Sequence, residues 1–373
     1  MSSGYSVAVV GAGIFGISAA IALAREGHSV TLFERSGDLI RGASGSNHRR
    51  LHLGYHYPRS LETVEQIQKS LEGFRREYGE AEIDDFRHYV AVSRDGSRTD
   101  VEGFLRFCEI AGLQLSEECP DFMRPESVEA CFRVPELSID LEVLKASCWR
   151  KLMRAGVSVH LETQVSHADL TPYERVIVAT YSTSGLFLLD AGYEPPIRLY
   201  EVCEKPVVRL PRAYAETSVI VLDGPFVSFD PVSRSGAAVL GDGLHGRHSS
   251  VLGVTRLVPR HLLPYIDAGV VSCPYSNFSK FKAAFADYFL GFDDVEHLGS
   301  RFTVRTVAAH ATHTDARLTD VRSLSERVIV VLGGKISTSV DAAQRVTELV
   351  RGSGEERNVV GLKVRPQGAS SRV

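Results

Sequence analysis

Apolar residues along the chain follow two different periods, and each period occupies its own regions. Ser6–Val10 is a short apolar run typical of a buried strand, and an apolar helix over Ile17–Glu26 and a second strand over Ser29–Phe33 follow it. Gly27 suits the left-handed position that ends such a helix. The pattern predicts a β-α-β unit at the start of the chain.

Patterns of the same kind return in the middle and at the end of the chain. The helices expected there are Leu141–Ala155 and Ser339–Arg351, and the strands are Val157–Leu161, Arg175–Thr180 and Arg327–Leu332. Because strands joined by helices pair in one parallel sheet, the separated pieces predict one nucleotide-binding domain that is interrupted twice.

Between these pieces, short strands alternate with turns rich in Pro, Gly and Asp, which is typical of antiparallel sheets. Strands are expected over His88–Ser93, Val202–Arg209, Ser218–Leu222, Phe226–Phe229 and Ala237–Gly241, and helices over Leu61–Tyr78, Val101–Ala111 and Phe278–Leu290. The predicted fold class is therefore α/β, a Rossmann-like domain interrupted by a mainly antiparallel-sheet domain. The first uses residues 1–80, 138–200 and 298–365, the second uses residues 81–137 and 201–297, and residues 366–373 form a loose tail.

Composition excludes several classes of protein. The chain has 373 residues, 44% hydrophobic and 24% charged, with a net charge of −4, which is ordinary globular usage without the basic excess of a nucleic-acid binder. The 6 cysteines form no CxxC pair, so we expect free thiols in a reducing, cytoplasmic compartment. Glycines interrupt the apolar stretch Val7–Ala24, so neither a membrane span nor a signal peptide is expected.

The strongest chemical signal is a glycine-rich turn between the first strand and the first helix. It reads Gly11-Ala12-Gly13-Ile14-Phe15-Gly16. The first glycine allows the tight turn, the second lets the backbone approach a pyrophosphate, and the third lets helix and strand pack closely. Glu34 ends the second strand, where a carboxylate accepts hydrogen bonds from adenosine ribose hydroxyls and repels a 2′-phosphate. Together they predict a bound dinucleotide other than NADP.

The chain resembles the D-amino-acid oxidase superfamily of FAD enzymes in three separated pieces. They are Val9–Glu34 with Arg35, then Gly42-Ala43-Ser44-Gly45-Ser46-Asn47 continuing to Ser60, and Val331–Thr338. Val178-Ala179-Thr180 looks like the family's short ATG turn, with Tyr181 in place of Gly. Ser44–Ser60 is similar to L-2-hydroxyglutarate oxidase-like proteins. The resemblance implies a glutathione-reductase-like FAD-binding domain and a substrate domain.

The resemblance also implies which residues contact FAD. Ser44 and Asn47 are expected along the pyrophosphate and ribityl chain, although a plain polar surface loop is the alternative. The complete set expected at the cofactor is Gly11, Gly13, Ile14, Phe15, Gly16, Glu34, Arg35, Ser44, Asn47, Arg50, Leu51, Val165, Ala179, Thr180, Gly333, Gly334, Lys335, Ile336 and Ser337.

Five residues are candidates for catalysis. Lys335 lies between a buried strand and a helix start, where a cation would stabilise reduced flavin or assist O2; a solvated loop lysine is the alternative. Arg317 is expected to hold a substrate carboxylate or contact the flavin, with a surface ion pair as the alternative. Arg49, His52 and Tyr55 are expected in the pocket wall, and His52 is suited to act as a base.

The density of histidines near His52 has several explanations. Alternation over Leu51–His56 predicts a strand with His52 and His56 on one face, in structural packing or in the substrate pocket wall. No metal is expected, because no acidic residue or cysteine lies close by in sequence. As in some relatives, His48 is a minor candidate for a covalent bond to the flavin.

The predicted function is an FAD-dependent oxidase or dehydrogenase. It would move a hydride from a CH–NH or CH–OH group of a small polar substrate to flavin N5, with O2 or another acceptor taking the electrons. The single dinucleotide fingerprint argues against NAD(P)H as the electron donor. Two alternatives remain: a flavoprotein without net redox turnover, mutase-like or binding, and a plain NAD-dependent dehydrogenase.

Overall fold

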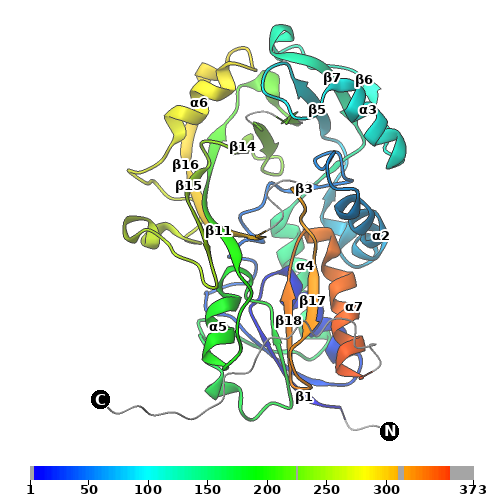
Figure 1. Cartoon of the computed structure of the whole chain (residues 1–373), viewed down its shortest axis with the longest axis vertical. Coiled ribbons are helices and arrows are strands. Elements are labelled where there is room, and N and C mark those ends of the chain that lie inside the picture. The colour runs from blue at the N-terminus through cyan, green and yellow to red at the C-terminus, as the bar shows by residue number, and fades with distance from the viewer. Residues whose placement is uncertain (1–3, 224–225, 310–314, 353–373) are drawn as a thin grey trace.

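Two β-sheets, stacked along the long axis of the molecule, organise the fold (Figure 1). The structure is a computed structural model, and it describes residues 4–223, 226–309 and 315–352. One sheet with its helices forms the lower half in Figure 1 and the other forms the upper half. This arrangement confirms the predicted α/β class. The predicted loose tail, residues 366–373, lies outside the described residues.

The lower sheet has six strands in the order β17-β18-β10-β1-β2-β9. They are β1 (Ser6–Val10), β2 (Ser29–Phe33), β9 (Ser158–His160), β10 (Arg175–Val178), β17 (Asp320–Ser323) and β18 (Val328–Leu332). Neighbouring strands are parallel except β17, which pairs antiparallel with β18. Strands from the start, middle and end of the chain thus share one sheet, as the three α/β pieces predict.

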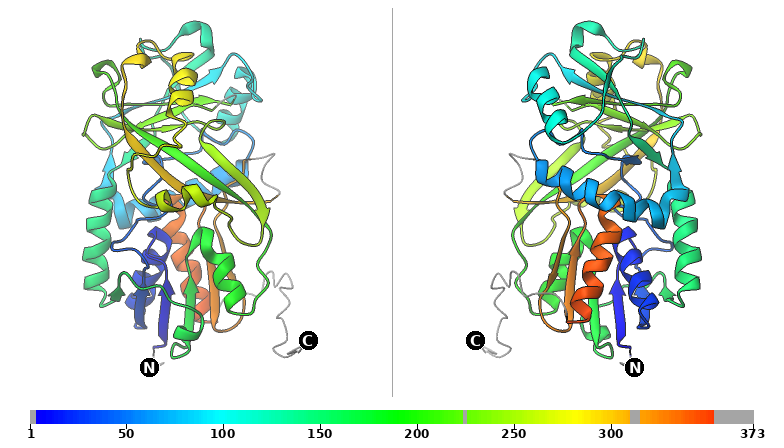
Figure 2. Two further views of the ribbon diagram at one scale, coloured as in Figure 1. Left: turned by 90° about the vertical axis from the view of Figure 1, so that its left-hand side faces the viewer. Right: turned by 90° about the vertical axis from the view of Figure 1, so that its right-hand side faces the viewer.

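Helices cover both faces of the lower sheet, which is why its inner strands β1, β2, β10 and β18 are largely apolar. The helices are α1 (Ile14–Arg25), α4 (Leu141–Arg154), α5 (Ser184–Asp190) and α7 (Ser339–Val350). α1, α4 and α7 share a core with Val7 and Val9, whereas α5 packs with Ala8 and Val10 on the opposite face. α1 and α7 lie side by side (Figure 2). α1 starts at Ile14 rather than the predicted Ile17, because the turn is already complete at Gly13.

The upper sheet has nine strands and is mainly antiparallel, as the turn-rich region predicts. They are β5 (Arg87–Ser93), β6 (Ser116–Glu117), β7 (Val128–Val134), β11 (Arg198–Arg209), β12 (Thr217–Leu222), β13 (Ser228–Pro231), β14 (Ala237–Gly241), β15 (Arg247–Gly253) and β16 (Glu296–Ala308). α3 (Val101–Ile110) packs on the face that carries Val90 and Val92, and α6 (Phe278–Ala286) on the face that carries Tyr89 and Ala91.

Three predicted elements differ from the structure. The strand expected over Phe226–Phe229 runs from Ser228 to Pro231. The helix expected over Phe278–Leu290 ends at Ala286, and the Leu290 N–H donates instead to the Phe122 carbonyl, 2.8 Å away. The strand expected over Leu51–His56 is wrong beyond Leu51, because Gly54 turns the chain with φ +129°.

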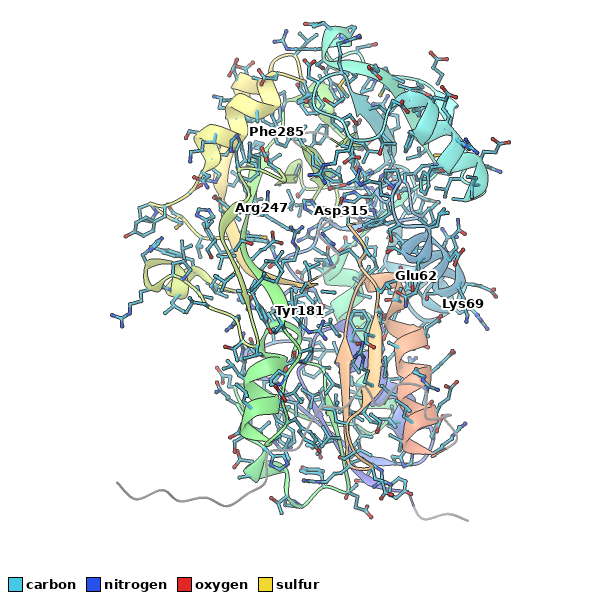
Figure 3. All side chains as sticks on the ribbon, viewed as in Figure 1. Glu62, Lys69, Tyr181, Arg247, Phe285 and Asp315 are labelled. Atoms are coloured by element: carbon cyan, nitrogen blue, oxygen red, sulfur yellow. The ribbon has the colours of Figure 1, made fainter. Side chains whose placement is uncertain are left out.

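A third, small sheet and a long helix join the two halves. β3 (Arg50–Leu51) pairs with β8 (Leu137–Ile139), which pairs with β4 (Glu82–Ile83). α2 (Leu61–Tyr78) contributes Phe74 and Tyr78 to the lower core and Val64 and Ile67 to the upper core. Its polar side chains Glu62 and Lys69 point to the outside (Figure 3). α2 is therefore an amphipathic helix whose apolar side chains pack into the cores of both halves.

The long strands β11 and β16 carry the upper sheet toward the lower half. They pair with each other from Arg198↔Ala308 to Arg209↔Glu296. The prediction assigned residues 298–365 to the cofactor domain, whereas this pairing puts residues 298–308 in the upper sheet. The division of the chain into domains otherwise stays a prediction.

Arg50 connects the segment after the glycine-rich turn to the upper sheet. Its side chain is fully buried, with Nε 2.9 Å from Asp230 Oδ1 and Nη1 3.0 Å from Glu136 Oε2, and it also donates to Ser218 Oγ. Burial raises the pKa of Glu136, but nearby His52 and Arg50 outweigh it and lower the pKa to about 2. Burial likewise raises the pKa of Asp230, but Arg50 outweighs it and lowers that pKa. Both carboxylates therefore stay ionised, and one guanidinium contacts both of them.

We expect Arg50→Met to destabilise the protein by about 3–5 kcal/mol, because it leaves two carboxylates buried without their cation. The matched control is Arg133→Met, which removes an exposed ion pair with Glu118 and should cost no more than about 1 kcal/mol. Urea unfolding of both variants measures the difference. Equal midpoints for the two variants would contradict the role given to Arg50.

Candidate functional site

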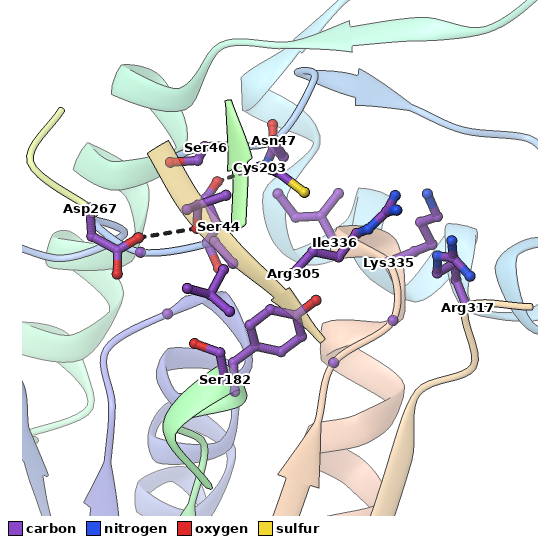
Figure 4. A pocket seen from close by; sticks show the side chains of 18 of the residues that line it. Ser44, Ser46, Asn47, Ser182, Cys203, Asp267, Arg305, Arg317, Lys335 and Ile336 are labelled. Atoms are coloured by element: carbon purple, nitrogen blue, oxygen red, sulfur yellow. Dashed lines mark hydrogen bonds between the residues drawn. The ribbon is translucent and has the colours of Figure 1, made fainter. Parts of the chain in front are cut away.

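A cavity of about 1450 Å³ is lined by residues of both sheets. From the lower half, the segments that follow β1, β2, β10 and β18 reach it, all at the carboxyl ends of parallel strands, where ligands of open α/β sheets bind. From the upper half, β11 contributes Cys203 and β16 contributes Arg305 (Figure 4). Lys205 of β11 and Thr303 of β16 also line the cavity. The volume exceeds the roughly 300–1,000 Å³ typical of small-ligand sites, so it has room for a large cofactor and a substrate.

The glycine-rich turn forms one end of the cavity. Gly11 has φ +100°, and a Cβ atom there would lie 2.7 Å from the Ala179 carbonyl oxygen; at Gly16 it would lie 1.9 Å from the Gly11 oxygen. Glu34 accepts hydrogen bonds from the backbone N–H groups of Ala12 and Ser36, each at 2.8 Å. Gly11, Gly13, Ile14, Phe15, Glu34 and Arg35 line the cavity, and Gly16 instead packs the helix against the turn.

The loop before β3 lies across the start of α1. Ser44 Oγ accepts the Ile14 N–H at 3.2 Å, which leaves the serine hydroxyl hydrogen free to donate. The Asn47 amide shapes the loop: it donates to the Ser44 carbonyl at 2.7 Å and accepts the Arg49 N–H at 2.7 Å. Arg301 of β16 donates to the Gly45 carbonyl at 2.6 Å. The loop is thereby held from both sheets and presents Ser44 and Asn47 to the cavity.

Tyr181 replaces the family's glycine after β10, and the turn keeps a left-handed residue there. Its φ is +50°, a conformation that costs a non-glycine residue roughly 1 kcal/mol or more. The phenol compensates for this by binding β16: it donates to the Thr306 carbonyl at 3.2 Å and accepts the Thr306 N–H at 3.1 Å. The substitution therefore preserves the turn and adds a bond between the two halves.

The segment after β18 closes the opposite side of the cavity. A Cβ atom at Gly333 would lie 2.2 Å from the Phe15 ring, and one at Gly334 would lie 2.0 Å from the Arg317 carbonyl oxygen. Only glycine therefore fits at either position. Gly333, Gly334, Lys335 and Ile336 line the cavity, whereas Ser337 is buried beside it.

Four cationic side chains converge on this side of the cavity. Lys335 and Arg317 lie next to each other (Figure 4), and Lys335 Nζ is 4.6 Å from the centre of the Tyr57 ring. Burial lowers the pKa of Lys335 to about 7, with further contributions from Arg317, Lys205 and Arg305. Burial likewise lowers the pKa of Lys205 to about 8. Arg305 is paired with Glu201, at 2.6 Å. The cluster favours an anionic ligand.

Three histidines form the wall above this cluster. His48 Nδ1 lies 3.3 Å from Asp230 Oδ2, and His52 Nδ1 lies 3.7 Å from Glu136 Oε1. The rings of His52 and His56 are 5.1 Å apart, and His56 is 4.4 Å from the Phe226 ring. Burial is the largest cause that lowers the pKa of His48 to about 4, so the imidazole is neutral near pH 7. Within residues 4–223, 226–309 and 315–352, no cluster of His, Cys, Asp or Glu is arranged to hold a metal.

Some predicted site residues lie away from the cavity. Tyr55 is buried in the upper core and donates to the Gln114 carbonyl, and Leu51 is buried in the lower core. Arg49 has φ +59°. Burial, followed by Arg301, lowers its pKa to about 10, and the nearby carboxylates are Asp140 and Glu142 rather than groups of the cationic cluster. None of these three lines the cavity. Val165, Ala179, Thr180, Arg50, His52 and Arg317 do line it.

The prediction missed Lys205 and Cys203, which face the cavity from β11. Two features of the sequence could have identified them. The alternation within the expected strand Val202–Arg209 puts both side chains on one face, and a lysine inside an apolar run is unusual. Asp230 and Glu136 had no local signal, because both come to the site from far along the chain.

The fold and the cavity define a dinucleotide-binding protein built on two sheets, and comparison with known proteins gives its family. The model of the family of FAD-dependent oxidoreductases (DAO) matches residues 6–231. The chain belongs to this family, which is the resemblance that the motifs indicated, and it is an FAD-dependent oxidoreductase whose cofactor is FAD. The glycine cradle and the start of α1, where the N-cap residue Gly13 has no side chain to cap the helix, fit the pyrophosphate of that cofactor.

Individual relatives are more distant. The FAD-dependent monooxygenase kojA of Aspergillus flavus is 26% identical and covers 95% of this chain and 87% of its own length, and the FAD-dependent monooxygenase FPY4 of Fusarium mangiferae is 26% identical over 93% and 91%. Among solved structures, glycine oxidase of Geobacillus kaustophilus has a TM-score of 0.69 at 16% identity, covering 99% and 100%. L-proline dehydrogenase of P. horikoshii has 0.71 at 16%, covering 95% and 96%. The structural likenesses support the fold.

We expect Glu34→Ala to weaken FAD binding by about 1–3 kcal/mol, because it removes a charged hydrogen-bond acceptor from the cavity and releases the turn at Ala12. Fluorescence titration of apoprotein with FAD measures the change. Glu65→Ala, which removes an exposed carboxylate from α2, is the matched control and should leave affinity unchanged. Equal affinity of Glu34→Ala and wild type would rule out the assigned contact.

Proposed function

We propose that the chain oxidises a CH–NH or CH–OH group of a small polar substrate that carries a negative charge. The observation that carries this proposal is the cationic cluster of Lys335, Arg317, Lys205 and Arg305 beside the glycines that follow β18. Arg305 is neutralised by Glu201, but Lys335 has no carboxylate within ion-pair distance among the described residues. A half-buried cation without a counter-ion favours an anionic ligand.

The chemistry divides between the cofactor and the chain. When bound, FAD supplies the hydride acceptor, at its N5 atom. Lys335 supplies positive charge toward the cofactor and favours its reduced, anionic form. Its lowered pKa, about 7, means that a nearby anion would also draw a proton onto the amine. Tyr57 holds the ammonium through its ring face.

Arg317 is the proposed carboxylate anchor. Its guanidinium lines the cavity, where Nη1 donates to the Ala316 carbonyl at 2.8 Å and Nη2 lies 4.0 Å from Asp315. This pairing is loose, since Asp315 makes its closer ion pair with Arg59. The remaining N–H groups of Arg317 are suited to a bidentate bond with a substrate carboxylate.

Two histidines, His52 and His48, are the alternative candidates for the base that takes the substrate's proton. His52 is the predicted base, but its Nδ1 is 3.7 Å from Glu136, which is too long for an orienting hydrogen bond. His48 is closer to its carboxylate, at 3.3 Å from Asp230, and Asp230 is fixed by Arg50. The shorter distance to a carboxylate favours His48 over His52, and neither Nδ1 atom makes a hydrogen bond.

The family membership leaves little support for the alternative of a plain NAD-dependent dehydrogenase, and it favours turnover over simple binding. O2 is proposed as the electron acceptor, because Lys335 adds positive charge where superoxide would form. No described helix has the length and apolar character needed to cross a bilayer. A cytoplasmic location stays a prediction.

An anaerobic screen tests the reaction. Purified holoenzyme is mixed with small amino acids, N-methyl amino acids and 2-hydroxy acids, each with its matched amine or alcohol lacking the carboxylate, and bleaching of the flavin absorbance is recorded. We expect bleaching by a carboxylate-bearing compound and little by its neutral partner. Bleaching that is insensitive to the carboxylate would contradict the anionic-substrate proposal.

Monooxygenation is the second candidate, because two 26%-identical relatives carry that name. The same screen therefore includes NADH and NADPH. Rapid bleaching by a reduced nicotinamide, with no bleaching by any substrate alone, would favour the monooxygenase and overturn direct substrate oxidation.

Lys335→Met tests the role of the cation, because methionine has a similar length without the charge. We expect the flavin of this variant to be harder to reduce and to reoxidise in O2 at least about tenfold more slowly than wild type, the scale of one lost charge contact of about 1.4 kcal/mol. Spectroscopic titration of the reduction potential and stopped-flow reoxidation measure both effects. Wild-type values for both quantities would refute the role.

A further inference from the structure

Cys119 and Cys131 are two thiols in contact at the outer edge of the upper sheet. β6 pairs with β7 at this edge, and the Glu118 N–H donates to the Cys131 carbonyl at 3.3 Å just after β6 ends. The side chains of Cys119 and Cys131 lie close enough for each thiol to shift the pKa of the other. Cys119 is exposed, whereas Cys131 is 5% exposed and belongs to the core of the upper sheet. No residue from 116 to 134 lines the described cavity.

The contact gives the two sulfur atoms different reactivity. The interaction between the two thiols lowers the pKa of Cys119 and raises that of Cys131. Because the thiolate is the nucleophile, the more acidic and exposed Cys119 reacts first with an oxidant from solvent. Cys131 then lies within reach of the product.

We propose that Cys119 and Cys131 form a reversible disulfide when the protein meets a hydroperoxide. The Cys119 thiolate attacks one oxygen of hydrogen peroxide, an S–O bond forms, the O–O bond breaks, and hydroxide leaves and is protonated to water. The sulfur of Cys131 then attacks the Cys119 sulfenic acid, an S–S bond forms, the S–O bond breaks, and the thiol proton leaves with the oxygen as a second water. Two thiols are oxidised and one peroxide is reduced.

The other cysteines provide an internal comparison. Cys108, Cys148, Cys203 and Cys273 are all buried, and burial is the largest cause that raises the pKa of each. These four thiols should therefore resist oxidation in the folded protein. The selectivity for Cys119 and Cys131 follows from exposure of one sulfur and its contact with the other.

The disulfide would link the segment of residues 119–124 covalently to β7 of the upper sheet. Residues 119–124 are joined to the end of α6, since Arg124 N–H donates to the Tyr288 carbonyl at 2.8 Å and Leu290 N–H donates to the Phe122 carbonyl at 2.8 Å. A bond from Cys119 to β7 ties this segment to the sheet as well. Because the segment lies outside the cavity, oxidation should leave FAD binding unchanged, so this proposal can fail without affecting the proposed function.

The experiment oxidises the folded holoenzyme with hydrogen peroxide, blocks remaining thiols with iodoacetamide after unfolding, and digests the unreduced protein after glutamate. Such cleavage separates Cys119, in residues 119–126, from Cys131, in residues 130–136. We expect a linked pair of these peptides, about 2 Da lighter than the sum of the free thiol forms. We also expect loss of two of the 6 thiols and recovery of both with dithiothreitol.

Two variants keep the test independent of folding defects. Cys131→Ser should stop at Cys119 oxygen adducts and lose the linked peptide, whereas Cys273→Ser, which removes a different buried thiol, should form it as wild type does. Cys119 found only as sulfinic or sulfonic acid in wild type, or linked to Cys119 of a second molecule, would overturn the proposal.

Discussion

The guanidinium of Arg50 is the point where the cofactor loop, the upper sheet and the segment between them meet. Removing three charges from water is costly, and only the complete set of contacts to Asp230, Glu136 and Ser218 offsets that cost. His48 and His52 lie on either side of Arg50 in sequence. His48 is near Asp230 and His52 is near Glu136, the two carboxylates that Arg50 contacts. The position of the histidine wall therefore depends on one buried ion cluster.

The cavity is electropositive in two parts, but the source of the positive charge differs between them. Near the glycine-rich turn, backbone N–H groups and the start of α1 offer partial positive charge without any formal charge. Near the segment after β18, whole cations are held in a poorly solvated place, and Lys335 keeps its proton only weakly, with a pKa of about 7. The first end suits a ligand that stays bound, and the second suits groups whose charge changes during a reaction.

Local sequence patterns were sufficient to predict the β-α-β unit and the lower sheet, which contains strands from the start, middle and end of the chain. Glycine spacing and apolar runs can be recognised within a few residues. The histidine segment was misjudged, since Gly54 turns the chain where alternation suggested a strand and buries Tyr55 away from the cavity. Asp230 and Lys205 could not be assigned, because their partners are chosen by strand pairing across the upper sheet. FAD contacts were therefore easier to predict than the catalytic wall.

The order of strands in the lower sheet has a consequence for how the protein is made. β1 ends at Val10, but it reaches β18, which begins at Val328, only through β10, and α1 packs against α7. During synthesis, the glycine-rich turn leaves the ribosome long before the segment that completes its site. The lower sheet stays incomplete until β18 has been synthesised, after the strands of the upper sheet. Contacts of such high sequence separation should make folding slow. Because the site is complete only once β18 and α7 have docked, bound FAD should stabilise the fully folded chain over partly folded ones.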